Sequence, residues 1–416
     1  MNSSIFSRGV DKKSFRPHKE FSQAEQRSGI LLIAVTIISV ILANSRFADA
    51  YIHFWHSTIG IHGFGSSFTL SIEQWINDGL MTIFFLVVGL EIKRELKQGE
   101  LSTFKKAALP MLAALGGMVV PAFIYSLIAT DASYAHGWGI PMATDIAFAL
   151  GIISLLGSRV PTSIKIFLTA LAVTDDLGAI IVIAVAYTTD MSLFHLLVAF
   201  GIFIFMFLMN RLRVSNFVYY ILAGTVMWYF MLKSGVHATL AGVLTAITIP
   251  SNTKFREYKE TALIEHRLHE FSTFNIMPLF ALANTALPLN LNFGELMASP
   301  LNHGIVAGLV LGKPIGIIGF SLLAIKLKLG VLSDNIRFKH ILGAGFLGGI
   351  GFTMSIFISM LAFNSPELQS FAKVSVLLGS LTSGIIGYAI LRTGKPIKDK
   401  SLSVKKVEVD SEYDDI

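Results

Sequence analysis

Four charged residues lie inside long apolar stretches of the sequence. They are Asp145, Asp175, Asp176 and Lys313. A charged side chain at the centre of a membrane helix costs roughly 2.5–3.5 kcal/mol, so structure alone does not favour keeping these residues. Three acids and one base leave an excess of negative charge, which favours binding of a cation or of protons. A structural ion pair between Asp175 and Lys313 is the alternative, but it leaves Asp145 and Asp176 unexplained.

The adjacent pair Asp175 and Asp176 has the chemistry of a shared cation and proton site. Neighbouring residues of a helix point about 100° apart, so the two carboxylates have different surroundings. Na⁺ is a hard cation that takes oxygen ligands, which these carboxylates, the Thr144 hydroxyl and freed backbone carbonyls would supply. Two close carboxylates in a low-dielectric setting also raise each other's affinity for protons. A site that binds either Na⁺ or protons can couple their movements.

Helix-breaking residues accompany these charges. Pro141 disfavours helical geometry just before it, so we expect the helix to unwind over 140–145. A second segment, 343–351, contains five glycines, each of which weakens a helix by about 1 kcal/mol relative to Ala. Asp145 and Lys313 would compensate the opposed partial charges of the resulting half-helix ends. The alternative is that Gly and Pro here only aid close helix packing.

The composition defines the surroundings in which these residues must act. Of 416 residues, 53% are hydrophobic and only 14% are charged, whereas soluble proteins carry about a quarter charged residues. We therefore predict an all-α polytopic membrane protein that forms one bundle. The absence of cysteine excludes disulfides, thiolate catalysis and Cys-ligated metal sites, and we expect no cofactor.

A span needs about 20 apolar residues, and the sequence predicts about 12 transmembrane helices within a single domain, 29–392. Polar tails precede and follow it at 1–28 and 393–416. The predicted spans are 29–44, 73–92, 107–130, 137–157, 163–188, 192–210, 216–232, 235–250, 268–288, 303–325, 339–363 and 370–391.

The interrupted helices are spans 4 and 11, the middle members of two three-span groups, 107–188 and 303–391. An odd number of spans in each group makes any repeat inverted in the membrane. Inverted repeats with two broken helices are typical of secondary transporters, with the binding site where the breaks meet.

Basic residues predict the orientation of the bundle. With both termini on one side, 29 of the 33 Lys and Arg residues fall on that side, which is therefore the cytoplasm. Because these residues cluster at the ends of apolar runs, the net charge of +6 indicates membrane topology and no nucleic-acid partner. On the outer side, alternation around Gly63-Phe64-Gly65 within 57–72 favours a small extracytoplasmic β-hairpin; an irregular polar loop is the alternative.

Other functions fit the sequence less well. An intramembrane aspartyl protease would carry Gly-x-Gly-Asp on one span, which is missing, and the segment 266–270 lacks the His-Glu-x-x-His order of zinc peptidases. A passive cation channel needs a continuous pore, and no filter-like repeat occurs. A Na⁺-coupled symporter for an organic anion remains open.

Eight motifs in order closely resemble the NhaA family of Na⁺/H⁺ antiporters over nearly the whole membrane region. They are WIND at 75–78, FFLVVGLEIKRE at 84–95, PMATDIAFALG at 141–151, LAVTDDLG at 171–178, SGVHATLAG at 234–242, MPLFALAN at 277–284, GKP at 312–314 and GFTMSIF at 351–357.

The resemblance implies twelve helices, with spans 4 and 11 crossing as broken pairs. It also implies a bacterial inner-membrane protein that exchanges intracellular Na⁺ or Li⁺ for a larger number of extracellular H⁺, regulating intracellular pH and sodium. By motif position, Asp175 and Asp176 would be the shared site, with Asp176 the principal ligand and Lys313 the exchangeable partner of Asp175. Thr144 would assist, and Asp145 would balance charge.

The resemblance further implies activation at alkaline pH, through acidic and His residues at a cytoplasmic funnel. Homodimers joined through the 57–72 hairpin are also expected. From the residues alone, a solvated helix end or an incidental interfacial His is an equally good interpretation of the funnel residues. Thr174 departs from the family pattern by adding a hydroxyl where an aliphatic residue is expected. The matching funnel residues are Glu91, Glu95, Glu265, His266 and His269.

Overall fold

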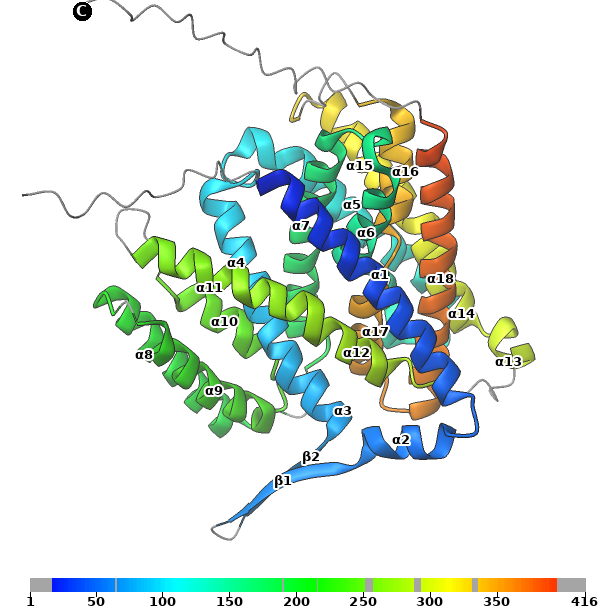
Figure 1. The fold of residues 1–416 in the computed structure, drawn as a ribbon. Helices are drawn as coiled ribbons and strands as arrows, with labels where there is room; N and C mark the ends of the chain where they lie inside the picture. The colour runs from blue at the N-terminus through cyan, green and yellow to red at the C-terminus, as the bar shows by residue number, and fades with distance from the viewer. Residues whose placement is uncertain are drawn as a thin grey trace, which may run out of the picture.

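The structure is a computed structural model that describes residues 17–63, 66–188, 191–214, 216–250, 257–287, 293–330 and 336–394. It is a helical bundle with one small hairpin (Figure 1). The tails predicted at 1–28 and 393–416 lie mostly outside the described residues, although α1 already begins at Pro17. The first half of the bundle comprises α1 (Pro17–Ala43), α2 (Ala48–His56), α3 (Ile72–Gln74), α4 (Met81–Gln98), α5 (Phe104–Ile128), α6 (Ile146–Leu156), α7 (Thr162–Ala186), α8 (Leu193–Arg211) and α9 (Phe217–Ser234).

Shorter helices are more frequent in the second half. They are α10 (Leu240–Thr248), α11 (Glu257–Phe271), α12 (Met277–Asn284), α13 (Phe293–Ala298), α14 (Pro300–Ala307), α15 (Lys313–Lys326), α16 (Phe338–Gly348), α17 (Phe352–Ala362) and α18 (Pro366–Arg392). Three π-helical turns connect helices end to end, namely η1 (Trp75–Leu80), η4 (Ser272–Ile276) and η5 (Gly308–Gly312). Of two 3₁₀ helices in the described residues, η2 (Ala135–Met142) precedes α6 and η3 (Gly157–Arg159) follows it.

Within the described residues, eight helices are long and apolar enough to cross a membrane, or nine when the bent pair α16 and α17 counts as one span. The protein is therefore a multi-pass membrane protein. Of the other predicted spans, 235–250 contains the nine-residue α10 and 268–288 contains the end of α11 with η4 and α12. The count of twelve and the inverted repeat stay predictions.

Both predicted helix breaks are confirmed, and they meet. The backbone leaves helical geometry over 143–145, between η2 and α6. The axes of α16 and α17 differ by 41° across a short break. Across the two breaks, the backbone N–H of Asp145 donates to the carbonyl of Ile350 at 2.6 Å. The two interruptions therefore satisfy some of each other's unpaired backbone groups, as an apolar setting requires.

The predicted β-hairpin is also confirmed. Strand β1 (Thr58–Gly63) pairs antiparallel with β2 (Ser66–Ser71), with Thr58 opposite Ser71. The hairpin extends from the bottom of the bundle in Figure 1, and the start of α1 and the end of α18 lie at the opposite side. We call these two faces the hairpin side and the terminal side.

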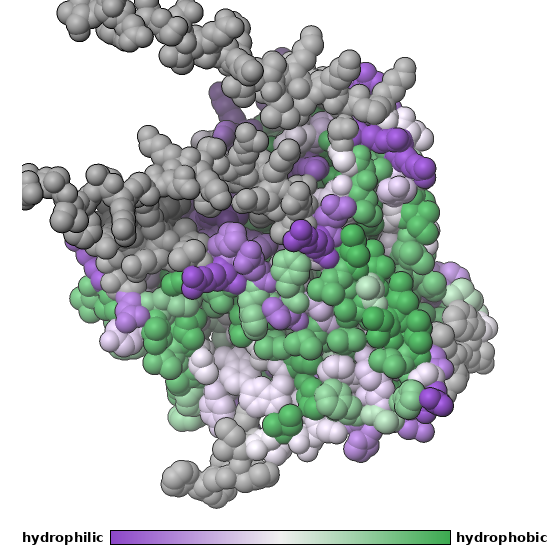
Figure 2. Space-filling model, in the orientation of Figure 1, coloured by the Kyte–Doolittle hydropathy of each residue, from purple (hydrophilic) through white to green (hydrophobic). Residues whose placement is uncertain are grey.

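An apolar belt crosses the middle of the face drawn in Figure 2, with hydrophilic residues above and below it. Large apolar side chains are exposed on the bundle, for example Phe200 at 56% on α8. Such a surface is costly in water and is suited to lipid. The apolar belt is thus the surface that contacts the membrane.

The helices form two groups. The core group consists of α5–α7 and α14–α18, within which α5 packs closely along α15. Their backbones nearly touch where Gly116 meets Gly316, because a Cβ on either glycine would overlap the other's carbonyl. The outer group consists of α3, η1, α4 and α8–α12, and α1 contacts both groups through α6 and α12.

Candidate ion-binding site

Asp175 and Lys313 form a buried ion pair in the core group. Asp175 lies halfway along α7 and is 1% exposed, and Lys313 begins α15 and is fully buried. The ammonium Nζ of Lys313 donates to Oδ2 of Asp175 at 2.6 Å. The ion pair between Asp175 and Lys313, which the sequence left as the structural alternative, is therefore present.

Thr144 connects this ion pair to the helix breaks. Its hydroxyl oxygen accepts a hydrogen bond from Lys313 Nζ at 2.8 Å and donates to the carbonyl of Gly348 at 2.8 Å. Gly348 is the last residue of α16, whose C-terminus carries a partial negative charge. The Lys313 ammonium therefore lies where it offsets that charge as well as the Asp175 carboxylate.

Asp145 lies at the N-termini of two half-helices. It is the N-cap of α6, with Oδ1 accepting from the backbone N–H of Phe148 at 3.0 Å. Its Oδ2 accepts from the N–H and hydroxyl of Thr353, at 3.2 and 2.5 Å, in the first turn of α17. A carboxylate is stabilised at such partially positive ends. The placement of Asp145 at a half-helix end thus agrees with the expectation.

Two partners of the breaks were missed from sequence. Thr353 holds Asp145, and the Ser355 hydroxyl donates to the carbonyl of Ile140 at 2.7 Å. Both lie directly after the glycine-rich segment, in GFTMS at 351–355. Short hydroxyl side chains beside an expected helix break were the available signal, because freed backbone groups there need partners.

The carboxylates of Asp175 and Asp176 are not fully paired with other groups. Oδ1 of Asp175 is buried without a hydrogen-bond partner. Asp176 is 7% exposed, and no hydrogen bond or ion pair reaches its carboxylate from the residues that the structure describes. Buried polar atoms are normally satisfied, so an unpaired oxygen on Asp175 beside the unpaired carboxylate of Asp176 indicates a place for a cation or protons. Thr174 bonds its own helix, at the carbonyl of Ala170.

Most of the predicted funnel residues gather between α4 and α11 on the terminal side. His269 Nδ1 lies 2.7 Å from Glu91 Oε1, and Arg94 donates to Glu265 Oε1 at 2.8 Å. Glu95 lies beside Arg94 at 3.8 Å. Burial raises the pKa of Glu265, and the neighbouring Arg94 partly opposes that rise. Glu91, Glu95, Glu265 and His269 therefore lie together with Arg94 in one cluster.

His266 does not join this cluster. Its side chain is 66% exposed, and it lies 3.9 Å from Glu270 on the same helix. Arg94 does belong to the cluster, although it is not among the funnel residues predicted from the sequence. A run of charges at a helix end gives no sign of which residue faces a neighbouring helix, because that depends on how the two helices pack.

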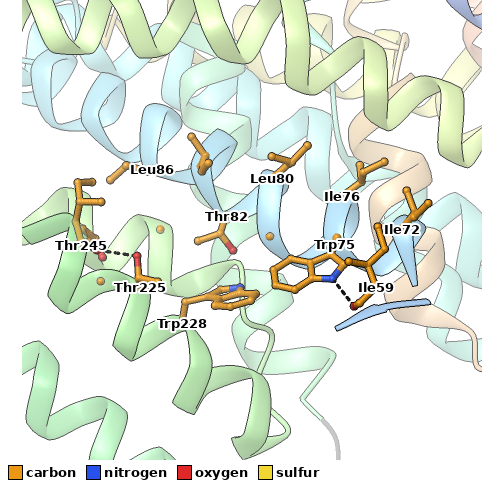
Figure 3. Close-up of a pocket in the computed structure, with 15 residues that line it drawn as sticks. Ile59, Ile72, Trp75, Ile76, Leu80, Thr82, Leu86, Thr225, Trp228 and Thr245 are labelled. Atoms are coloured by element: carbon orange, nitrogen blue, oxygen red, sulfur yellow. Dashed lines mark hydrogen bonds between the residues drawn. The ribbon is translucent and has the colours of Figure 1, made fainter. Parts of the chain in front are cut away.

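An apolar cavity of about 540 Å³ lies between α4, α9, α10 and the hairpin (Figure 3). Trp75 and Trp228 stack with ring centroids 5.9 Å apart, and their indole N–H groups donate to the carbonyls of Ile59 and Asp78. The lining contains no charged side chain. A cation would find no strong ligand there, so this cavity is not the ion site.

Broken helices that meet beside buried, partly unpaired carboxylates define a secondary transporter of the membrane, not an enzyme. Sequence comparison gives the family. The model of the family described as Na⁺/H⁺ antiporter 1 matches residues 19–391. The chain therefore belongs to the NhaA family of Na⁺/H⁺ antiporters. The resemblance carried by the eight motifs is confirmed. Because the general association of broken helices with transport was drawn in part from NhaA itself, it is not independent support for this assignment.

Relatives from several bacteria align over nearly their whole length. The chain is 49% identical to Na(+)/H(+) antiporter NhaA 1 of Flavobacterium johnsoniae over 383 residues, which is 91% of this chain and 97% of that one. It is 50% identical to Na(+)/H(+) antiporter NhaA of Flavobacterium psychrophilum over 377 residues, 90% and 95% of the two chains. The Vibrio parahaemolyticus protein of the same name is 45% identical, over 91% and 98%.

Proposed function

We propose that the protein exchanges intracellular Na⁺ or Li⁺ for a larger number of extracellular H⁺, with Asp175 and Asp176 as the shared site. The observation that carries this proposal is the pair of adjacent buried acids, Asp175 and Asp176, of which Asp175 has one buried oxygen without a partner. Family membership supports Na⁺ and H⁺ as the exchanged ions. Regulation of intracellular pH and sodium follows as the physiological role.

Competition for the same oxygens couples the two ions. Asp176 is the principal Na⁺ ligand, because its carboxylate is available without breaking an ion pair. Asp175 becomes a second ligand only when it leaves Lys313, which lies 2.6 Å away, or shares that residue with the ion. Protonation of the carboxylates removes the negative charge that binds Na⁺, so proton and Na⁺ binding exclude each other.

The helix breaks prepare this site. Thr144 holds the Lys313 ammonium through its hydroxyl, and Asp145 balances two helix N-termini. Movement of more than one H⁺ for each Na⁺ makes the exchange electrogenic. Thr144 is a secondary Na⁺ ligand once Lys313 moves away, since its hydroxyl oxygen already accepts a hydrogen bond from a cation.

The setting and regulation are also proposals. We place the protein in the bacterial inner membrane with both termini in the cytoplasm, so that the hairpin side is extracytoplasmic. Homodimers form through the 57–72 hairpin. Activation at alkaline pH acts through Glu91, Glu95, Glu265 and His269, which lie together; the exposed His266 contributes less.

Reconstitution into acid-loaded proteoliposomes that contain a pH-sensitive dye tests the exchange. We expect added NaCl or LiCl to drive H⁺ out and dequench the dye, KCl to have little effect, and an imposed membrane potential to change the rate. Asp176→Asn should abolish the response. Asp131→Asn is the matched control because Asp131 is exposed and outside the spans.

Three outcomes of this experiment contradict the proposal. Dequenching by Na⁺ that survives in Asp176→Asn would reject the site. Dequenching that needs no added Na⁺ or Li⁺ would indicate a passive leak and hence a channel. A requirement for an organic anion would indicate symport.

A further inference from the structure

Lys373 is a buried lysine that the exchange site does not use. It lies two turns into α18 of the core group and is 7% exposed. Its ammonium Nζ is 3.6 Å from Oε1 of Glu73 and 3.4 Å from Oδ1 of Asn284. Glu73 lies on α3 and Asn284 ends α12. Both of these partners therefore belong to the outer group.

A pair of amides extends the contact between the groups. Asn77 and Asn284 exchange hydrogen bonds of 2.8 and 3.3 Å through their Nδ2 and Oδ1 atoms. Asn77 Nδ2 also lies 3.3 Å from Sδ of Met360, on α17 of the core group. These residues and Lys373 lie toward the ends of their helices nearest the hairpin.

The ion pairs on the terminal side lie within one group of helices. Arg94 with Glu265 and Glu91 with His269 join α4 to α11, which are both in the outer group. They would survive if the two groups moved as units. Lys373 would lose both of its described partners in such a movement. A buried charge that loses its partner is strongly unfavourable unless water reaches it.

We propose that Glu73 and Lys373 form a latch that holds the outer and core groups together on the hairpin side. The bound ion reaches that side only after the latch opens. This inference rests on the proposed exchange, in which the site is exposed to each side in turn. The latch sets the balance between the two arrangements without touching the transported ion.

Opening the latch should change the KM for Na⁺ in opposite directions on the two sides of the membrane. The apparent affinity for Na⁺ from one side falls in proportion to the fraction of molecules open to that side. Removing the latch raises the open fraction on the hairpin side and lowers it on the terminal side. Glu73→Gln should therefore lower the KM for Na⁺ at the hairpin side by about fivefold, a typical size for conformational coupling, and raise the KM at the terminal side.

Right-side-out and everted membrane vesicles containing the full chain separate these two KM values. The variants are Glu73→Gln, Lys373→Met and their double substitution. Glu367→Gln is the matched control, because Glu367 is an exposed acid in the first turn of the same helix. The double substitution should shift KM no further than either single one, since both break one interaction. Equal shifts on both sides, or none, would overturn the latch.

Cross-linking provides a readout that does not depend on transport. The natural chain has no cysteine, so Asn77→Cys with Met360→Cys introduces one reporter pair across the group boundary. Oxidation should join the two cysteines. Adding Lys373→Met should slow that reaction about threefold or more, because the groups spend less time together. Adding Glu367→Gln should not.

The transport and cross-linking experiments show separately whether the proposed exchange or the latch is wrong. If the wild-type vesicles show no Na⁺-driven proton movement, the proposed exchange is wrong, and the cross-linking rates still decide whether the latch exists. If exchange is normal but cross-linking is equally fast with and without Lys373, the latch is wrong and the exchange stands.

Discussion

Thr353 donates both its backbone N–H and its hydroxyl to one carboxylate oxygen of Asp145, although 208 residues separate the two in sequence. The other oxygen of Asp145 caps α6. One negative charge thus stabilises the beginnings of two half-helices that come from different parts of the chain. The site of broken helices depends on this contact for its geometry.

Asp145→Ala should therefore destabilise the protein more than the loss of a single helix cap. Losing one cap costs about 0.5–2 kcal/mol, so we expect the free energy of unfolding to fall by roughly 2–4 kcal/mol. Thermal unfolding in detergent, followed by tryptophan fluorescence, measures the change. Asp131→Ala removes an exposed acid and is the control. Equal melting temperatures for the two variants would show that Asp145 does not stabilise the two helix N-termini.

Lys313→Met should destabilise the fold because it leaves Asp175 buried without its partner. Breaking one side of a buried pair typically costs about 3–5 kcal/mol. The double variant Asp175→Asn with Lys313→Met should recover part of this loss, since no lone charge remains. A double-mutant cycle of melting curves gives the coupling. Additive losses would mean that the 2.6 Å contact contributes no pairing energy.

Replacing Lys313 should also make exchange less dependent on the membrane potential. In proteoliposomes, Lys313→Ala should reduce the effect of an imposed membrane potential on the rate of Na⁺-driven proton movement, because a charge that takes part in the cycle is missing. Lys326→Ala, at the other end of α15, is the control. An unchanged dependence on potential would contradict the partner role proposed for Lys313.

Gly116→Val should destabilise the packing of α5 against α15, because the new side chain would meet the carbonyl of Gly316 and the ring of Phe320. Overpacking of this kind costs typically about 1–3 kcal/mol. Gly319→Val on α15 is the control, since a Cβ there meets nothing within 4 Å. Melting temperatures compare the two. A similar loss in both variants would mean that the general effect of valine, and not the close approach, is responsible.

Glu265→Gln should make stability less dependent on pH. Burial raises the pKa of Glu265 above its ordinary value of 4.5 in the folded protein, so the fold binds this proton more tightly than the unfolded chain does. Stability from this group is present below pH 4.5 and is lost as pH rises through the higher folded pKa. Melting temperatures across that window should fall more steeply for wild type than for the variant. A steeper fall in the variant would mean that folding does not raise the pKa of Glu265.

Much of the site could be predicted from sequence because charge in an apolar stretch is costly and therefore conspicuous. Asp145, Asp175, Asp176 and Lys313 stand out for that reason, and Pro141 with the glycines of 343–351 marks where helices cannot continue. Family resemblance supplied the roles of these residues, which composition alone does not assign. Outside the apolar stretches the signal is weak. Glu91, His266 and His269 resemble any solvated helix end.

Residue types along the chain are enough to predict that it spans a membrane, where its helices break and which charges are buried, because lipid penalises polar groups at each position independently of the rest of the fold. Which of these groups meet depends on the folded arrangement. Thr353 reaches Asp145, His269 but not His266 reaches Glu91, and Lys373 crosses to Glu73. Such partnerships depend on the rotation and packing of helices far apart in the chain, and no local pattern of residues encodes them.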